Sequence, residues 1–307
     1  GHWNEAAGVL ERFRSRHPGH ELEPQVTRKL AAAYLEAGRQ HDAAVELERV
    51  SADTAEDAEV RRAVLWQAAE LYAVTEDSAS ARRAYAAYVE RFPTPVEPAI
   101  EARQELADLA GAAGDAASRK RWLEELVVAA DASGSERSHL LAARASLELA
   151  RPLDQLARSI GLAIPLDRSL AAKKAAMEAS LSAYARAAGY GVAEVTTAAD
   201  FAMADLYRDL ARALLASERP AGLSAEELEQ YDLLLEEQAY PFEGKAIGIH
   251  ERNARRARDG IYDRWVRDSY AALAEMKPAR YGRTETLDGP AATEASAPAL
   301  SRTIADT

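Results

Sequence analysis

Apolar residues recur every three or four positions through most of this 307-residue chain, which is the spacing of an amphipathic α-helix. Alanine is abundant throughout, and glycine and proline occur singly at intervals rather than in clusters. Alternation of β-branched residues is almost absent before the short segment VAEVTT at residues 192–197. The pattern predicts an all-α fold.

A repeat is visible within the first 131 residues. Four helical segments align on Ala6, Ala43, Ala81 and Arg119, which are spaced by 37, 38 and 38 residues, and each has apolar residues four and seven positions later. The last three segments are each preceded by a second helical segment, RKLAAAYLEAG, LWQAAELYAVTE or ELADLAGAAG. The repeating unit is therefore predicted to be a pair of helices.

These residues resemble the tetratricopeptide repeat, a helix-turn-helix unit of about 34 residues that stacks into a right-handed α-solenoid. The logic of that repeat fits, because small residues let paired helices approach and larger ones fill the groove between repeats. The period here is three or four residues longer, which we interpret as longer loops, and Arg119 weakens the fourth unit. The alternative is another antiparallel helical array with alanine-rich contacts.

The period fades after residue 131, where residues 132–281 are expected to continue the array as longer, non-canonical helices. Residues 139–150 and 153–165 are interpreted as a degenerate fifth pair. Further helices are predicted over 168–188, 192–214, 225–240 and 242–276, with Pro241 as an interruption and Gly260 as a kink. Residues 282–307 are small, polar and proline-bearing, so a flexible tail is expected.

The distal segments 193–220, 223–253 and 262–281 resemble the region that closes large envelope tetratricopeptide proteins of Gram-negative bacteria, including periplasmic gliding-motility components. That resemblance implies an exported, periplasmic scaffold. It also implies partners among the subunits of a Tol/Ton-type, proton-driven motor in the inner membrane.

Composition narrows the classes of function. The chain has 50 acidic and 38 basic residues and a net charge of −12, which disfavours attraction to nucleic acid or to anionic lipid. The absence of cysteine excludes disulfides and thiolate chemistry. No apolar run is long enough for direct membrane insertion. The first residues have the pattern of the middle of a helix, so we expect a fragment of a longer protein.

Each catalytic motif that the sequence suggests lacks a required residue. His250 and Glu251 could begin a zinc-binding HExxH helix, but Ala254 stands where the second histidine is needed. Gly244 and Lys245 suggest a phosphate loop, yet Ala246 replaces the magnesium-binding hydroxyl. We therefore expect no enzyme, no cofactor and no metal site.

Charge is unevenly distributed near the end of the chain. Residues 226–243 carry seven acidic side chains and no basic one, whereas residues 252–267 carry six arginines. One interpretation is an arginine patch for an acidic partner or a phosphate. The favoured one is two antiparallel helices whose opposite charges face each other across the break at Pro241.

The repeat register also predicts which side chains line a binding groove. They are Arg28, Glu36, Trp66, Glu70, Gln104 and Asp108. Members of the resembled family hold the carboxylate of chaperone C-termini with basic and amide groups, but two of the corresponding positions here are acidic, which favours a basic or amphipathic peptide. The alternative is that several are merely solvated and that Trp66 belongs to the core.

These observations predict a non-enzymatic protein-protein interaction scaffold whose groove binds a protein or peptide partner. The alternative function is a structural spacer within a longer repeat protein, with the partner bound by the distal helices or the tail.

Overall fold

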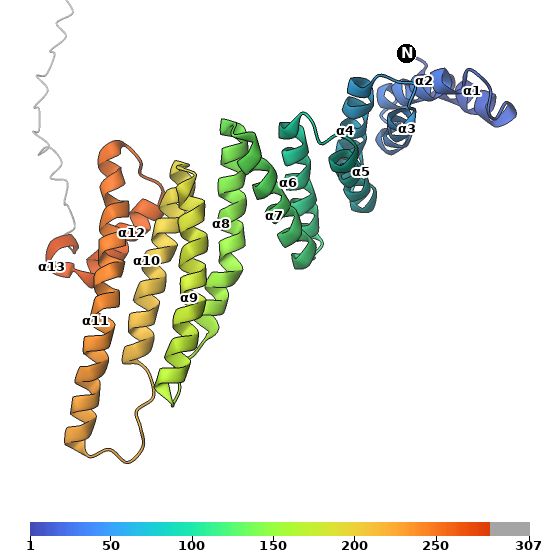
Figure 1. Cartoon of the computed structure of the whole chain (residues 1–307). Helices are drawn as coiled ribbons and strands as arrows, with labels where there is room; N and C mark the ends of the chain where they lie inside the picture. The colour runs from blue at the N-terminus through green and yellow to red at the C-terminus, as the bar shows by residue number, and fades with distance from the viewer. Residues whose placement is uncertain (283–307) are drawn as a thin grey trace, which may run out of the picture.

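The computed structural model describes residues 1–282 as a row of α-helices packed side by side (Figure 1). The α-helices are α1 Trp3–Arg16, α2 Glu23–Glu36, α3 Gln40–Ala52, α4 Ala58–Val74, α5 Ser78–Arg91, α6 Val96–Ala112, α7 Ala116–Ser133, α8 Glu136–Ser159, α9 Leu166–Gly189, α10 Ala193–Leu215, α11 Ala225–Arg255, α12 Arg264–Met276 and α13 Pro278–Tyr281. A short 3-10 helix, η1, covers Arg256–Asp259. No strand occurs within the described residues, which confirms the all-α prediction.

Helices α2 to α7 form three antiparallel pairs in which each helix packs against the next along the chain. The first helix of each pair is α2, α4 or α6, and the second is α3, α5 or α7. This arrangement is the predicted tetratricopeptide-like solenoid, with α1 packed at its N-terminal end and longer helices following α7.

The turn inside each pair repeats with the period of the sequence. The second residue after each first helix, Gly38, Glu76 or Gly114, has a positive φ of 74°, 62° or 72°. In each turn the next backbone N–H donates to a carbonyl five residues earlier, as Asp77 does to Tyr72 at 2.9 Å. This hydrogen bond caps the C-terminus of each first helix, and the three turns recur every 38 residues.

Alanines lie where the helices of the repeats cross. Ala43 and Ala81 are fully buried, as the alignment predicts, but Ala6 is exposed and its neighbour Ala7 is buried instead.

A hypothetical Cβ at Gly111 would lie 3.1 Å from Cδ of Arg119, so this glycine makes room for the arginine stem. The guanidinium of Arg119 reaches onward to Glu148 of α8 at 3.0 Å.

The expected fifth pair is wrong. Residues 139–150 and most of 153–165 belong to the single helix α8, which continues through Pro152 and packs with α7 on one side and α9 on the other. Proline removes one backbone N–H and hinders one carbonyl, but no glycine or turn residue stands beside it to end the helix. Pro152 itself is exposed, and the packing of α8 against α7 and α9 keeps the helix continuous.

The expected break at Pro241 is also wrong. Helix α11 runs unbroken for 31 residues, and Pro241 is exposed, so water can satisfy the carbonyl that loses its partner. The helix ends instead at η1 and Gly260, whose φ is 81°, so the helix expected over 242–276 is two elements. The acidic stretch therefore shares one helix with Arg252 and Arg255, the other four arginines lie on η1 and α12, and the expected pair of oppositely charged antiparallel helices does not form.

A buried polar network joins α10, α11 and α12. The side-chain amide of Asn253 donates to the Thr197 carbonyl at 3.1 Å and to Oγ of Ser269 at 2.9 Å. The Thr197 hydroxyl donates to Asp263, which also caps the N-terminus of α12. These partners fix how α12 sits against α10 and α11, since each buried group would be costly to leave unpaired.

Candidate protein-binding face

The six predicted groove residues all lie on the first helices of the pairs, α2, α4 and α6. We call the side of these helices that carries the six residues the first-helix face. On α4 the indole N–H of Trp66 donates to Oε1 of Glu70 at 2.7 Å. On α6 the amide of Gln104 donates to both carboxylate oxygens of Asp108 at 3.1 Å.

Trp66 is partly core and partly surface. Its ring packs edge-on against Tyr85 and Tyr88 of α5, with centroids 5.5 and 5.3 Å apart. The residue nevertheless remains only half-buried. Trp66 thus packs against the core of the pair and stays partly accessible, and its role in binding remains a prediction.

Carboxylates gather between α4 and α6. Partial burial raises the pKa of Glu105, and the charges of Asp108, Glu70 and Glu101 raise it further. Burial raises the pKa of Tyr85, and the charges of Glu105 and Glu70 raise it further. We define Glu70, Glu105 and Asp108 as the acidic cluster; all three are exposed, and none makes an ion pair within residues 1–282.

Glu105 was missed by the sequence reasoning. The available signal was the spacing of Glu101, Glu105 and Asp108, which places three carboxylates on one side of a helix. Glu101 differs from the cluster because Arg137 of α8 neutralises it at 2.9 Å.

Arg28 and Glu36 stand apart from the acidic cluster. Arg28 forms an ion pair with Glu56 in the loop before α4, and both line a hollow that also includes Glu23 and Asp53. Glu36 is exposed near the end of α2. The structure therefore joins four of the six predicted residues in two pairs and leaves these two elsewhere.

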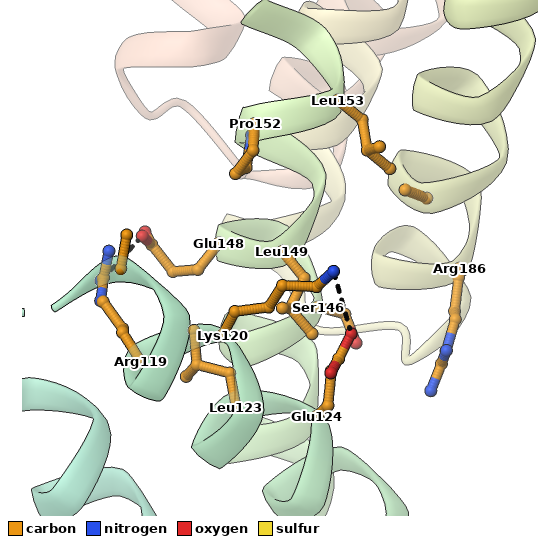
Figure 2. Close-up of a pocket in the computed structure, with 12 residues that line it drawn as sticks. Arg119, Lys120, Leu123, Glu124, Ser146, Glu148, Leu149, Pro152, Leu153 and Arg186 are labelled. Atoms are coloured by element: carbon orange, nitrogen blue, oxygen red, sulfur yellow. Dashed lines mark hydrogen bonds and ion pairs between the residues drawn. The ribbon is translucent and has the colours of Figure 1, made fainter. Parts of the chain in front are cut away.

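A more enclosed hollow of about 380 Å³ lies between α7, α8 and α9 (Figure 2). Its lining is mostly apolar, with Leu123 of α7 and Leu149 of α8 on its walls and Pro152 at one side. Charged groups at its edge form ion pairs, as Lys120 does with Glu124 at 3.7 Å and Arg119 with Glu148 at 3.0 Å. No sequence signal pointed to this hollow, because it depends on how α8 diverges from α7.

The residues of the two incomplete catalytic motifs have structural roles. His250 is fully buried, and burial lowers its pKa to about 4, so it is neutral at physiological pH. Lys245 lies over the Tyr207 ring, with Nζ 5.2 Å from the centroid. Among residues 1–282 no group of three or more histidine, aspartate or glutamate side chains is arranged to hold a metal ion.

Within the same part of the chain, no helix combines the length and apolar character needed to cross a membrane.

Of the known proteins compared with this chain, solved structures show similarity to it. No protein-family model matches the sequence, and no curated protein matches it. A tetratricopeptide repeat protein from Parabacteroides merdae is 13% identical over 87% of this chain and 90% of that chain, with a TM-score of 0.33. A circular tandem repeat protein with novel repeat topology is 18% identical over 91% of this chain and 59% of that chain, with a TM-score of 0.29. The fold assignment therefore rests on the helix pairs of this chain itself.

Proposed function

We propose that this protein is a non-enzymatic scaffold that holds a basic segment of a partner protein on the first-helix face of α4 and α6. The observation that carries the proposal is the half-buried indole of Trp66 beside the acidic cluster, Glu70, Glu105 and Asp108. Burial raises the pKa of Glu105, and the like charges of Asp108 and Glu70 raise it further, so the carboxylates of the cluster repel one another.

A lysine or arginine side chain would relieve that repulsion. Its charge would interact with several carboxylates at once, and the exposed part of Trp66 offers a ring for a cation–π contact worth about 0.5–2 kcal/mol. A partner carboxylate would instead add to the repulsion. The face therefore suits a basic or amphipathic peptide and not a chain terminus presented through its carboxylate.

The test is isothermal titration of the full chain with a synthetic amphipathic peptide that carries lysines on one side and leucines on the other. The variant Glu70→Gln with Glu105→Gln removes two charges and leaves the packing of Trp66 unchanged. We expect it to weaken binding about tenfold, corresponding to about 1.4 kcal/mol. Added salt should also weaken binding of the peptide to the wild type, because salt screens the attraction between lysines and carboxylates.

The matched control is Glu226→Gln with Glu229→Gln, which changes the net charge equally but lies on exposed positions of α11. It should bind as the wild type does. Loss of binding in this control, with the α4 and α6 variant unaffected, would reject the first-helix face. That result would favour the alternative in which the repeats are a spacer and the distal helices bind the partner.

We further propose that the scaffold works in the bacterial periplasm beside subunits of a Tol/Ton-type motor. The support is the sequence resemblance of residues 193–281 to the closing region of envelope tetratricopeptide proteins. Fractionation of cells that produce the tagged native protein tests the compartment. Recovery from the periplasmic fraction is expected, and recovery from the cytosol alone would contradict it.

A further inference from the structure

A hollow of about 440 Å³ lies where α11, η1, α12 and α13 meet. Three arginines line it, one from each of α11, η1 and α13: Arg255, Arg258 and Arg280. We call it the arginine hollow. The expected pair of oppositely charged helices does not form, so these arginines fit the other interpretation of the sequence, an arginine patch for an acidic partner or a phosphate.

The arginine hollow carries more positive than negative charge. Glu251 is the carboxylate among its lining residues, and it accepts hydrogen bonds from Lys277 at 3.2 Å and from Arg280 at 3.3 Å. Arg255 and Arg258 are exposed and form no ion pair within residues 1–282. The C-terminus of α11 adds the equivalent of only about half a negative charge. A surplus of positive charge is therefore left at the hollow.

Two neighbouring arginines differ because they have a structural partner. Arg252 and Arg256 both bind the buried carboxylate of Asp200, at 2.6 and 2.8 Å, and so attach the end of α11 and η1 to α10. That attachment does not use Arg255 or Arg258.

The guanidinium groups of the arginine hollow keep unused hydrogen-bond donors. Arg255 donates through Nε to the Glu251 carbonyl at 3.1 Å, and its terminal nitrogens have no partner in the described part of the chain. Arg258 makes no side-chain hydrogen bond there, and Arg280 uses one terminal nitrogen for Glu251. Donors that converge from three elements suit an anion with several acceptor oxygens.

Two tyrosines hold one wall of the arginine hollow in place. The hydroxyl of Tyr281 donates to Oε1 of Glu251 at 3.3 Å, and that of Tyr270 donates to the Ala254 carbonyl at 3.1 Å. The guanidinium of Arg280 lies over the Tyr281 ring, 5.2 Å from its centroid. These groups are positioned before a ligand arrives, which lowers the cost of ordering them on binding.

The pKa of Glu251 reflects the same charge balance. Burial raises this pKa, but the hydrogen bond and charge of Lys277 and the charge of Arg280 lower it overall. The surroundings therefore stabilise a negative charge, and a second anion in the hollow would meet the same field.

The acidic residues nearby leave this field in place. Glu243, the last residue of the acidic stretch, precedes Arg255 by twelve positions, which is about 18 Å along a helix. Exposed charges farther apart than about 8 Å are largely screened at physiological salt. Asp259 follows Arg258 in the chain, but it is exposed and forms no ion pair among residues 1–282.

We propose that the arginine hollow binds the phosphate monoester group of a small ligand. Such a group carries about −1.5 to −2 charges at pH 7 and three acceptor oxygens, so each oxygen can accept from a different guanidinium. A carboxylate has one charge and two oxygens and would neutralise less of the surplus. The volume of about 440 Å³ lies in the range of about 300–1,000 Å³ typical of small-molecule pockets, so the ligand has a body beyond its phosphate.

The test is isothermal titration of the full chain with phenyl phosphate at neutral pH. Phenyl sulfate is the matched probe, because it has nearly the same shape but a single negative charge. We expect phenyl phosphate to bind with a Kd below about 1 mM and phenyl sulfate to bind about tenfold more weakly. Both measurements use the wild type, so they do not depend on the folding of a variant.

The variant Arg255→Gln with Arg258→Gln changes two exposed side chains and should weaken binding of phenyl phosphate about tenfold or more. Arg255→Lys with Arg258→Lys keeps the charge but loses the planar fork, so it should recover only part of that loss. The matched control is Arg12→Gln with Arg16→Gln, which changes the net charge equally on exposed positions of α1, at the opposite end of the row of helices (Figure 1). It should bind phenyl phosphate as the wild type does.

Three results would overturn the proposal. One is no binding of phenyl phosphate to the wild type up to about 10 mM, and another is equal affinity for phenyl sulfate. The third is an equal loss of binding in the α1 control, which would show general attraction to basic surface. A blocked peptide with one phosphoserine tests a phosphorylated partner protein as the source: we expect it to bind no tighter than phenyl phosphate, and binding about tenfold tighter would reject a small ligand.

Discussion

The repeats α2 to α7 and the distal helices α8 to α12 use different interactions to fix how their helices pack. In the repeats, fully buried alanines such as Ala43, Ala69 and Ala81 let helices approach, and tyrosines fill the space between them. In the distal region, buried polar side chains such as Asn253 and Asp200 select specific partners on other helices. Contacts between small apolar residues can recur in every repeat, whereas a buried polar network fixes one specific arrangement of helices.

The first prediction tests whether the repeats unfold apart from the distal helices. Leu65 of α4 is fully buried, so Leu65→Ala should lower the free energy of unfolding by about 2–5 kcal/mol. Each helix pair contacts only its neighbours, so hydrogen exchange should accelerate in α3 to α6 and change little in α10 to α12. Equal acceleration along the whole chain would show that the two regions form one cooperative unit.

The second prediction concerns pH and the distal region. Burial, followed by the charge of Arg208, lowers the pKa of His250 from 6.5 to about 4. The unfolded chain therefore binds a proton between these pH values that the folded chain does not bind. Folding stability should fall by about 3 kcal/mol as pH drops from 6.5 to 4, and His250 contributes no change above that range.

The measurement is urea unfolding of the wild type and of His250→Gln across this pH range. Carboxylates elsewhere affect both proteins alike, so the difference between them isolates the histidine. An identical pH dependence in the two proteins would contradict the buried neutral state of His250.

The third prediction compares two amide side chains. Asn253→Ala should cost about 1–3 kcal/mol, because it leaves the Thr197 carbonyl and the Ser269 hydroxyl without their donor in the interior. Gln104→Ala, on the surface of the repeats, should change stability by less than about 0.5 kcal/mol. Urea unfolding measures both losses of unfolding free energy. Equal losses would show that the buried polar network of the distal region matters no more than a surface amide of the repeats.

The fourth prediction concerns the repeating turn. Glu76 has a φ of 62°, where Gly38 and Gly114 occupy the matching turns. Glu76→Gly should stabilise the chain by about 1 kcal/mol, since a side chain in the left-handed region costs roughly 1–2 kcal/mol. Gly114→Glu should destabilise it by a similar amount, and thermal unfolding of both variants measures the pair. Shifts of the same sign would contradict the equivalence of the three turns.

The repeats could be predicted from the sequence because their signals are local and recur. The turns at Gly38 and Gly114 and the buried residues Ala43 and Ala81 follow from a period of 38. The continuity of α8 and α11 could not be predicted in the same way. Proline is unfavourable inside a helix by its local chemistry, and only packing against neighbouring helices or exposure to water decides whether the helix continues.

The same distinction applies to the candidate site. The pairs Trp66 with Glu70 and Gln104 with Asp108 are four residues apart on one helix, so the spacing alone indicates that they touch. The approach of Glu105 to Glu70 crosses from α6 to α4 and depends on how one repeat sits on the next. No sequence spacing contains that information.

The most direct test of the central claim is carbodiimide coupling of the unmodified protein to the lysine-bearing amphipathic peptide, with the products mapped by mass spectrometry. Carbodiimide joins a carboxylate to an amine without a spacer, so at low reagent concentration a lysine bound next to a carboxylate couples fastest. We expect the peptide lysines to couple chiefly to Glu70, Glu105 and Asp108. Coupling chiefly to carboxylates of α11, with these three unmodified, would contradict it.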